Sequence, residues 1–228
     1  MESDGDIYVA AVGPLTNIAM ALRIEPRIAG KIKQLIIMGG GHTGANASSA
    51  AEFNFYADPE AAKIVMDSAI PKVILPLDAT WRACITEDQV KELAAMDTPA
   101  AKFTAVMVQK RIDNLKVNDV SQHNYELRHT PGTVGSVVLY RYDNDRAPIH
   151  DALTIAYLID ESVVTEYVDA NVDIDISGGI CDGRMVADVH NTKKGRDPIT
   201  AKVALNADGG KFARMLFENF AKKSIDNI

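Results

Sequence analysis

Positive charge, long apolar runs and cysteine are all scarce in this sequence, and each shortage excludes a class of protein. The 228 residues include 24 Lys and Arg against 31 Asp and Glu, which gives a net charge of −7. Nucleic-acid surfaces need clustered positive charge, so we expect no nucleic-acid partner. No apolar run approaches the length of a membrane span, and no apolar signal segment opens the chain. We therefore expect a cytoplasmic protein without a membrane partner.

The two cysteines, Cys84 and Cys181, lie far apart and lack the spacing of metal ligands. They are typical of reduced thiols in a cytosolic protein, and a disulfide between them is the alternative. No repeat, low-complexity tract or linker interrupts the chain, and 47% of its residues are hydrophobic, which is enough for a substantial core. We predict a single domain spanning residues 1–228.

Short apolar runs alternate with helical segments in the first third of the chain. Residues 7–12, 35–38 and 73–77 have the composition of buried strands. Helices are predicted between and after the first two: 14–23, 26–32 and 58–68. This alternation predicts an α/β fold, a three-layer αβα arrangement with a largely parallel, mixed sheet.

The later segments continue the pattern less regularly. Helices are expected over 99–118, from Pro148 to about 159 and over 211–220, and strands over 167–176 and 202–205. The alternation in 167–176 is typical of a half-exposed, antiparallel strand. Part of residues 119–147 is interpreted as a mobile cover, and Tyr140 and Tyr142, which flank it, either face a flat nucleobase or are ordinary packing residues.

In parallel sheets, ligands gather at the carboxyl ends of the strands, here near Val12, Met38 and Asp78. Glycines 39–41 follow the second of these ends. They lack the Lys-Ser/Thr of a phosphate-binding loop, so we interpret them as backbone room for a ligand or turn. Asn46 follows in a small polar loop, where a solvated side chain is the alternative to a ligand contact.

An acid and an amide, Glu52 and Asn54, flank Phe53 just before a predicted helix start at Asp58-Pro59. In an extended segment, residues two apart project to the same side. A carboxylate and an amide placed together can bind the hydroxyls of a sugar. The alternative is a polar turn that merely precedes a helix.

The pair His150-Asp151 lies in the first turn of the helix predicted from Pro148. An acid is favoured there by the helix dipole, and the histidine offers a titratable proton near neutral pH. A helix-start acid beside a surface histidine is the alternative interpretation of an isolated pair.

Taken together, these segments resemble the inosine-uridine type nucleoside hydrolases. The match runs, in order and with fitting spacing, through Val-Gly-Pro-Leu-Thr-Asn (12–17), Glu-Pro-Arg-Ile (25–28), Met-Gly-Gly-Gly (38–41), Asn46, Ala-Glu-Phe-Asn (51–54), Asp-Pro-Glu-Ala-Ala (58–62), Pro-Leu-Asp-Ala-Thr (76–80) and Pro-Ile-His-Asp (148–151). The resemblance implies a nucleoside hydrolase-like α/β fold, and hydrolysis of the N-glycosidic bond of a ribonucleoside to ribose and free base.

The resemblance also implies roles for individual residues. The Val12 carbonyl and the Asp151 carboxylate correspond to ligands of a calcium ion. The implied contacts to the nucleoside, chiefly to its ribose, are Met38, Asn46, Glu52, Phe53, Asn54 and Asp151. His150 corresponds to the histidine beside the leaving base.

One departure from the family bears on activity. The family begins with an aspartate cluster of the form Asp-x-Asp-x-x-x-Asp-Asp, and this sequence contains none. We therefore expect a family member without its N-terminal part, with an incomplete calcium site and little activity alone. The alternatives are a working hydrolase, and a silent ribose- or ligand-binding fragment or half of a split enzyme that needs a partner chain. A homo-oligomer is expected.

Overall fold

A computed structural model describes residues 3–117, 145–190 and 198–222 of the chain. Tyr140 and Tyr142 lie outside these residues. The chain divides into two compact units, Met1–Thr80 with Val164–Ala207, and Trp81–Val163 with Asp208–Ile228. Each unit is built from two stretches that are distant in the sequence, so neither corresponds to a contiguous half. The single domain over 1–228 stays a prediction.

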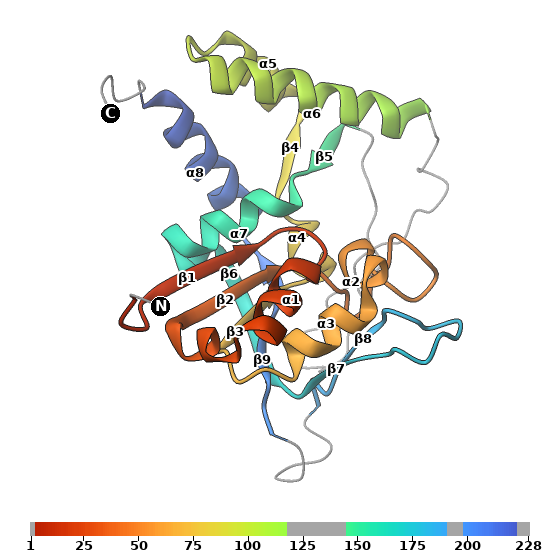
Figure 1. The fold of residues 1–228 in the computed structure, drawn as a ribbon. Coiled ribbons are helices and arrows are strands. Elements are labelled where there is room, and N and C mark those ends of the chain that lie inside the picture. The colour runs from red at the N-terminus through yellow and green to blue at the C-terminus, as the bar shows by residue number, and fades with distance from the viewer. Residues whose placement is uncertain (1–2, 118–144, 191–197, 223–228) are drawn as a thin grey trace. The chain divides into compact units, whose positions relative to one another are not determined.

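The first unit contains a five-stranded sheet with strand order β1-β2-β3-β9-β6. Its strands are β1 (Ile7–Ala11), β2 (Ile32–Met38), β3 (Lys72–Leu75), β9 (Ala201–Ala207) and β6 (Val164–Ala170). The first four run parallel and β6 pairs antiparallel with β9. Figure 1 shows β1, β2 and β3 side by side. The predicted α/β class with a largely parallel, mixed sheet is confirmed.

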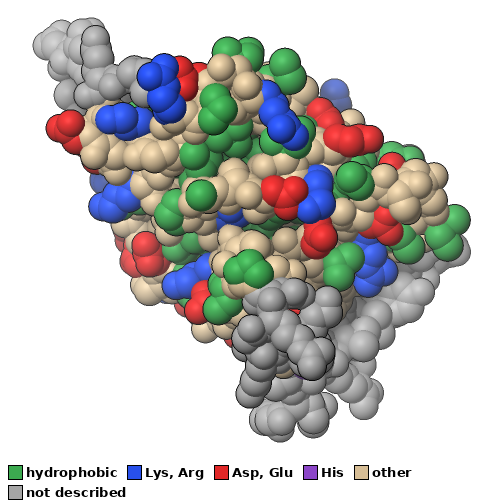
Figure 2. All heavy atoms as spheres, turned by 60° about the horizontal axis from the view of Figure 1, so that its bottom comes forward, with side chains coloured by type: hydrophobic (Ala, Val, Ile, Leu, Met, Phe, Trp, Pro, Cys, Tyr) green, Lys and Arg blue, Asp and Glu red, His purple; other side chains and the backbone are tan. Residues whose placement is uncertain are grey.

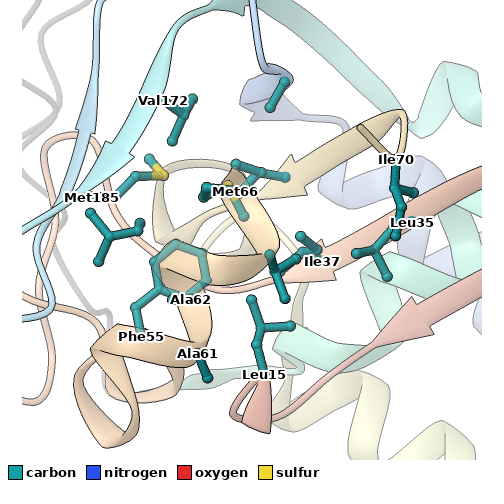
Figure 3. Close-up of a cluster of buried hydrophobic side chains, with 14 of the residues drawn as sticks. Leu15, Leu35, Ile37, Phe55, Ala61, Ala62, Met66, Ile70, Val172 and Met185 are labelled. Atoms are coloured by element: carbon teal, nitrogen blue, oxygen red, sulfur yellow. The ribbon is translucent and has the colours of Figure 1, made fainter. Parts of the chain in front are cut away.

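Helices α1 (Thr16–Ile24) and α3 (Pro59–Met66) contribute to the main hydrophobic core of this unit. Their apolar residues recur at helical spacing and meet one face of the sheet, where alternate strand residues such as Leu35 and Ile37 are fully buried. In Figure 3, Phe55 of the short helix α2 (Phe53–Ala57) lies in the same cluster as Met185. The core therefore reaches the segment predicted to bind a sugar.

Several predicted boundaries are corrected by the structure. The third strand ends at Leu75, because Pro76 cannot donate a ladder hydrogen bond and α4 (Leu77–Thr80) begins directly after it. The predicted strand 167–176 is two strands, β6 and β7 (Val172–Ile174), and β7 pairs with β8 (Met185–Ala187) in a separate hairpin. The first helix begins at Thr16, two residues later than predicted from Pro14.

The 3-10 helix η1 (Pro26–Lys31) confirms the predicted short helix after Pro26. Its N-terminal neighbour Glu25 accepts a hydrogen bond from the Arg27 backbone nitrogen. At the amino-terminal end of the neighbouring strand β3, the Lys72 ammonium is buried and donates to two carbonyl oxygens, those of Ser68 (2.6 Å) and Ile70 (2.9 Å). Burial lowers the pKa of Lys72 to about 8.

The second unit is built around helices. Its elements are β4 (Cys84–Thr86), α5 (Glu87–Ala95), α6 (Pro99–Val117), β5 (Arg146–Pro148), α7 (His150–Ile159), η3 (Glu161–Val163) and α8 (Gly209–Ala221). β4 and β5 pair antiparallel, so Pro148 ends a strand and the helix predicted from it begins at His150. A capping box between Thr86 and Gln89 starts α5.

Helix α6 confirms the long helix predicted over 99–118, and α5 and α6 pack against each other. Of its predicted apolar positions, Val108 and Ile112 are buried, whereas Phe103 and Met107 are exposed. No helix among the described residues has the length and apolar character needed to cross a membrane. On the face drawn in Figure 2, acidic and basic side chains are interspersed among apolar ones.

Gly40 offers a test of the packing that joins β2 to the core. Its φ of 72° is left-handed, and a Cβ there would lie 2.8 Å from both Met185 Sδ and Phe55 Cε2. We expect Gly40→Ala to lower the free energy of unfolding by roughly 2–4 kcal/mol, from left-handed strain and overpacking together. Urea unfolding followed by circular dichroism measures this change.

Gly30→Ala is the matched control, because a Cβ at Gly30 meets nothing within 4 Å and its φ is not left-handed. It should change the free energy of unfolding by no more than about 0.5 kcal/mol. Equal losses in the two variants would contradict the packing described for Gly40.

Candidate functional site

The carboxyl ends of three parallel strands define the candidate site in the first unit. Val12 follows β1, Met38 ends β2, and Leu75 ends β3. The pairs Ala11↔Ile37 and Met38↔Leu75 place these ends along one edge of the sheet. The loop after β2 and the start of α2 lie at the same edge: one hydrogen bond joins the loop to the N-cap of α2, and another joins α2 to the end of β2.

Glu52 is the N-cap of α2, and its side chain is only 2% exposed. Its carboxylate accepts hydrogen bonds from the backbone nitrogens of Asn54 (2.9 Å), Phe55 (3.2 Å) and Gly40 (2.8 Å). The first two satisfy amides at the helix start, and the third ties the helix to the glycine loop. The sequence-based expectation of an extended Glu52–Asn54 segment is wrong, because capping by Glu52 starts a helix at Phe53.

Asn54 faces the end of β2. Its Nδ2 donates to the Met38 carbonyl oxygen (3.0 Å) and approaches Met38 Sδ (3.2 Å), and both residues are buried. The Asn54 Oδ1 accepts no hydrogen bond from the part of the chain that the structure describes. One end of this amide is therefore held by the protein, and the other end is unoccupied.

Asn46 shows the opposite arrangement. Its Oδ1 accepts from the Phe53 backbone nitrogen (2.9 Å), and within the described residues its Nδ2 has no acceptor. The Ala51 carbonyl oxygen accepts from the backbone nitrogens of Asn46, Ala47 and Ser48 at 3.1–3.3 Å, which closes the loop. Asn46 is exposed and Phe53 is 58% exposed. An amide donor and an aromatic ring are thus presented to solvent together.

The structure brings together five of the predicted residues, Met38, Asn46, Glu52, Phe53 and Asn54, through the contacts just described. Val12 lies at the end of the neighbouring strand and is 41% exposed. His150 and Asp151 belong to the second unit, in the first turn of α7. Their convergence with the loop cluster stays a prediction.

The pKa values of His150 and Asp151, in the first turn of α7, are both shifted. Burial, followed by the positive charge of Arg111, lowers the pKa of His150 to about 4. Desolvation raises the pKa of Asp151, and Arg111 opposes that shift. His150 is therefore a neutral imidazole near pH 7.

Asp78, which the sequence placed near a strand end without an assigned role, is a buried anchor of the same strand-end region. Its carboxylate is 2% exposed and accepts from the His42 nitrogen (2.8 Å), the Thr43 nitrogen (3.0 Å) and the Thr43 hydroxyl (2.5 Å). Burial lowers the pKa of the His42 side chain, Asp78 opposes this, and nearby Arg184 lowers it further. The only sequence signal was the position of Asp78 just after a strand.

The residues that the structure describes do not make a complete calcium site. Calcium takes six to eight oxygen ligands. The implied ligands are one carbonyl, from Val12, and one carboxylate, from Asp151, and they belong to different units. No group of three or more His, Cys, Asp or Glu that could hold a metal occurs among the described residues.

The sequence profile described as inosine-uridine preferring nucleoside hydrolase matches residues 1–214. This chain belongs to that family. A pyrimidine-specific ribonucleoside hydrolase, RihB, of Escherichia coli O157:H7 (strain EC4115) is 34% identical over 214 residues, or 93% of this chain and 59% of the relative. A putative RihB of Shigella dysenteriae is 35% identical over 190 residues, or 82% of this chain and 60% of the relative.

Solved structures show the same fold. A plant nucleoside hydrolase, PpNRh1, superposes with a TM-score of 0.78 at 27% identity, over 96% of this chain and 63% of that chain. A purine-preferring ribonucleoside hydrolase from Gardnerella vaginalis superposes with a TM-score of 0.76 at 27% identity, over 95% and 61%. The chain spans about three-fifths of the length of these relatives.

The lowered pKa of His150 predicts a pH-dependent loss of stability. In the unfolded chain the imidazole takes a proton near its ordinary pKa of 6.5, and in the fold only near 4. Unfolding therefore becomes easier as pH falls from 6.5 towards 4. We expect the wild type to lose about 2 kcal/mol more than His150→Gln between about pH 7 and about pH 5.

Urea unfolding at both pH values checks this, with Trp81 fluorescence as the readout, because the single tryptophan belongs to the same unit as His150. Carboxylates titrate in both proteins, so their contribution to the pH dependence of stability cancels when the wild type is compared with His150→Gln. Identical pH dependence in wild type and His150→Gln would contradict a buried, neutral His150.

Proposed function

We propose that this chain carries the sugar-binding part of a nucleoside hydrolase, and that the reaction it serves is hydrolysis of the N-glycosidic bond of a ribonucleoside to ribose and free base. The proposal rests on two side-chain amides at the strand ends whose hydrogen-bonding states are complementary. Asn46 has its acceptor engaged and its donor unoccupied, whereas Asn54 has its donor engaged and its acceptor unoccupied, within the described residues.

Sugar hydroxyls suit such a pair, because each hydroxyl both donates and accepts. In the proposal, Asn46 Nδ2 donates to one ribose hydroxyl and Asn54 Oδ1 accepts from a neighbouring one. The Glu52 carboxylate is held close to these amides by three backbone donors. Phe53 and Met38 form apolar walls beside the sugar. Both amides are fixed in advance by hydrogen bonds within the protein, which reduces the entropy lost on binding.

The chemistry of bond cleavage develops positive charge on the sugar ring, as in glycoside hydrolysis generally. In the proposal, the buried Glu52 carboxylate beside the ribose favours that charge. His150 is assigned to the leaving base. Because its pKa is about 4, it would act there as a neutral hydrogen-bonding imidazole near pH 7.

Calcium is the cofactor that family membership suggests, with the Val12 carbonyl and Asp151 as the ligands this chain would offer. These two groups fall short of what the ion needs. We therefore propose that the chain alone binds calcium weakly and has little activity.

A second candidate function, favoured by the same shortage of ligands, is a silent ribose-binding module, or one half of an enzyme whose partner chain supplies the remaining carboxylates. A homo-oligomer remains part of the proposal.

The base preference is open, since relatives named pyrimidine-specific and a structure named purine-preferring both match. An assay of the 228-residue chain with inosine, uridine, adenosine and cytidine, with calcium and with chelator, tests activity by release of reducing sugar. We expect little or no hydrolysis in every condition. Robust, chelator-sensitive hydrolysis would show that other acids complete the metal site, and the proposed weak activity would be wrong.

Ribose binding is tested separately by calorimetric or NMR titration. Asn46→Leu should weaken binding about tenfold or more, because it removes the donor that the loop presents. Ser49→Ala is the matched control: Ser49 is an exposed neighbour in the same loop, and no hydrogen bond is described for its side chain. Equal affinity in the wild type and Asn46→Leu would refute the assigned role of Asn46.

A further inference from the structure

Two buried acids hold the first part of the loop between β2 and α2. At its start, Gly40 donates its backbone N–H to Glu52. Two residues later, the His42 and Thr43 nitrogens and the Thr43 hydroxyl all donate to Asp78. Asp78 lies on α4, which follows β3, the strand that pairs with β2. The loop is therefore anchored to two other segments of the first unit.

From this geometry we propose that Asp78 is a positioning residue for the ligand site: it fixes the turn at His42-Thr43 and thereby the direction in which Asn46 presents its amide. The inference deepens the proposed function and rests on it, because it takes Asn46 to be the ligand-facing donor. Asp78 acts through the loop and has no assigned contact with the ligand.

A carboxylate is well suited to this position. Its two oxygens offer about four acceptor positions and no donor, so three N–H and O–H groups can converge on it without repulsion. Oδ2 takes the His42 nitrogen, and Oδ1 takes both groups of Thr43. An asparagine would keep the shape but turn an NH2 group towards one of these donors. Charge-assisted bonds in a buried setting are also stronger than neutral ones.

The fixed turn determines the position of Asn46, because only a short, tightly packed stretch of chain separates the two. A Cβ on Gly41 would lie 2.0 Å from the Gly44 carbonyl oxygen, so the chain folds back on itself at once. Leu77, next to Asp78, donates its backbone nitrogen to the Gly40 carbonyl oxygen (3.0 Å) and adds a second link to α4. Asn46 then lies between this anchored turn and the Ala51 carbonyl oxygen that closes the loop.

The experiment compares Asp78→Asn, Asp78→Ala and Thr43→Val in the full chain by hydrogen–deuterium exchange and by ribose titration. Peptides covering 42–48 should exchange at least about tenfold faster in Asp78→Ala, less so in Asp78→Asn, and least in Thr43→Val, which removes only the hydroxyl contact. Peptides of α3 (Pro59–Met66) should exchange as in the wild type. Ribose affinity should fall most in Asp78→Ala, less in Asp78→Asn and least in Thr43→Val.

Ile37→Val is the matched control, because Ile37 is a fully buried core residue of β2 with no part in the loop anchor. It should lower global stability while leaving exchange at 42–48 relative to α3, and ribose affinity, within about twofold of the wild type. If Asp78→Ala fails to fold, Thr43→Val and Asp78→Asn still test the proposal.

The outcomes separate the two proposals. Unchanged exchange at 42–48 in the Asp78 variants, or an equal rise there and in α3, would overturn the positioning role whatever the ribose result. Local loosening at 42–48 without any change in ribose affinity would overturn the link from Asp78 to the ligand. If Asn46→Leu also left ribose affinity unchanged, the assigned ribose contact would fail while the anchoring by Asp78 stood.

Discussion

Three backbone N–H groups from two segments converge on the Glu52 carboxylate, which is buried where β2 gives way to its loop. A buried charge is tolerated only when it is well hydrogen-bonded, and Glu52 meets that condition with backbone amides alone among the contacts described for it. The start of α2 and the position of Gly40 are consequently specified by the same group. Because α2 carries Phe55 into the core, this polar contact also determines the packing beneath the strand ends.

The core and the candidate site are therefore built from the same segments of the chain. Gly39 and Gly40 leave space that the Phe55 ring fills, since a Cβ at Gly39 would lie 2.5 Å from the ring. The ring is buried, whereas the neighbouring Phe53 points outward and is exposed. Two positions of one short helix thus differ in surroundings: Phe55 packs in the core, and Phe53, to which the proposal assigns a ligand contact, is exposed.

The parallel strands and most helices could be predicted from the sequence, because short apolar runs, prolines and capping residues act locally. The capped helix at Asp58-Pro59 and the capping box at Thr86 are examples of signals contained within a few residues. Glu52 was assigned an extended backbone, since nothing local shows that its side chain would cap its own helix and reach back to Gly40. Asp78 was left undecided because its partners lie 35 and 36 residues earlier. Contacts over such distances depend on strand order, which a single sequence does not state.

The place of β9 in the sheet has a consequence for how the chain folds as it is made. β3 pairs with β9 through Val73 and Lys202, which are 202 − 73 = 129 residues apart. At ribosomal speeds of about 5–20 residues per second, roughly 6–26 seconds pass between the synthesis of these two partners. Throughout that interval, the edge of β3 that pairs with β9 in the finished fold lacks this partner strand. Contacts so distant in sequence slow folding and prolong the exposure of strand edges. The nascent sheet is therefore most vulnerable to misassembly while the second unit is being synthesised.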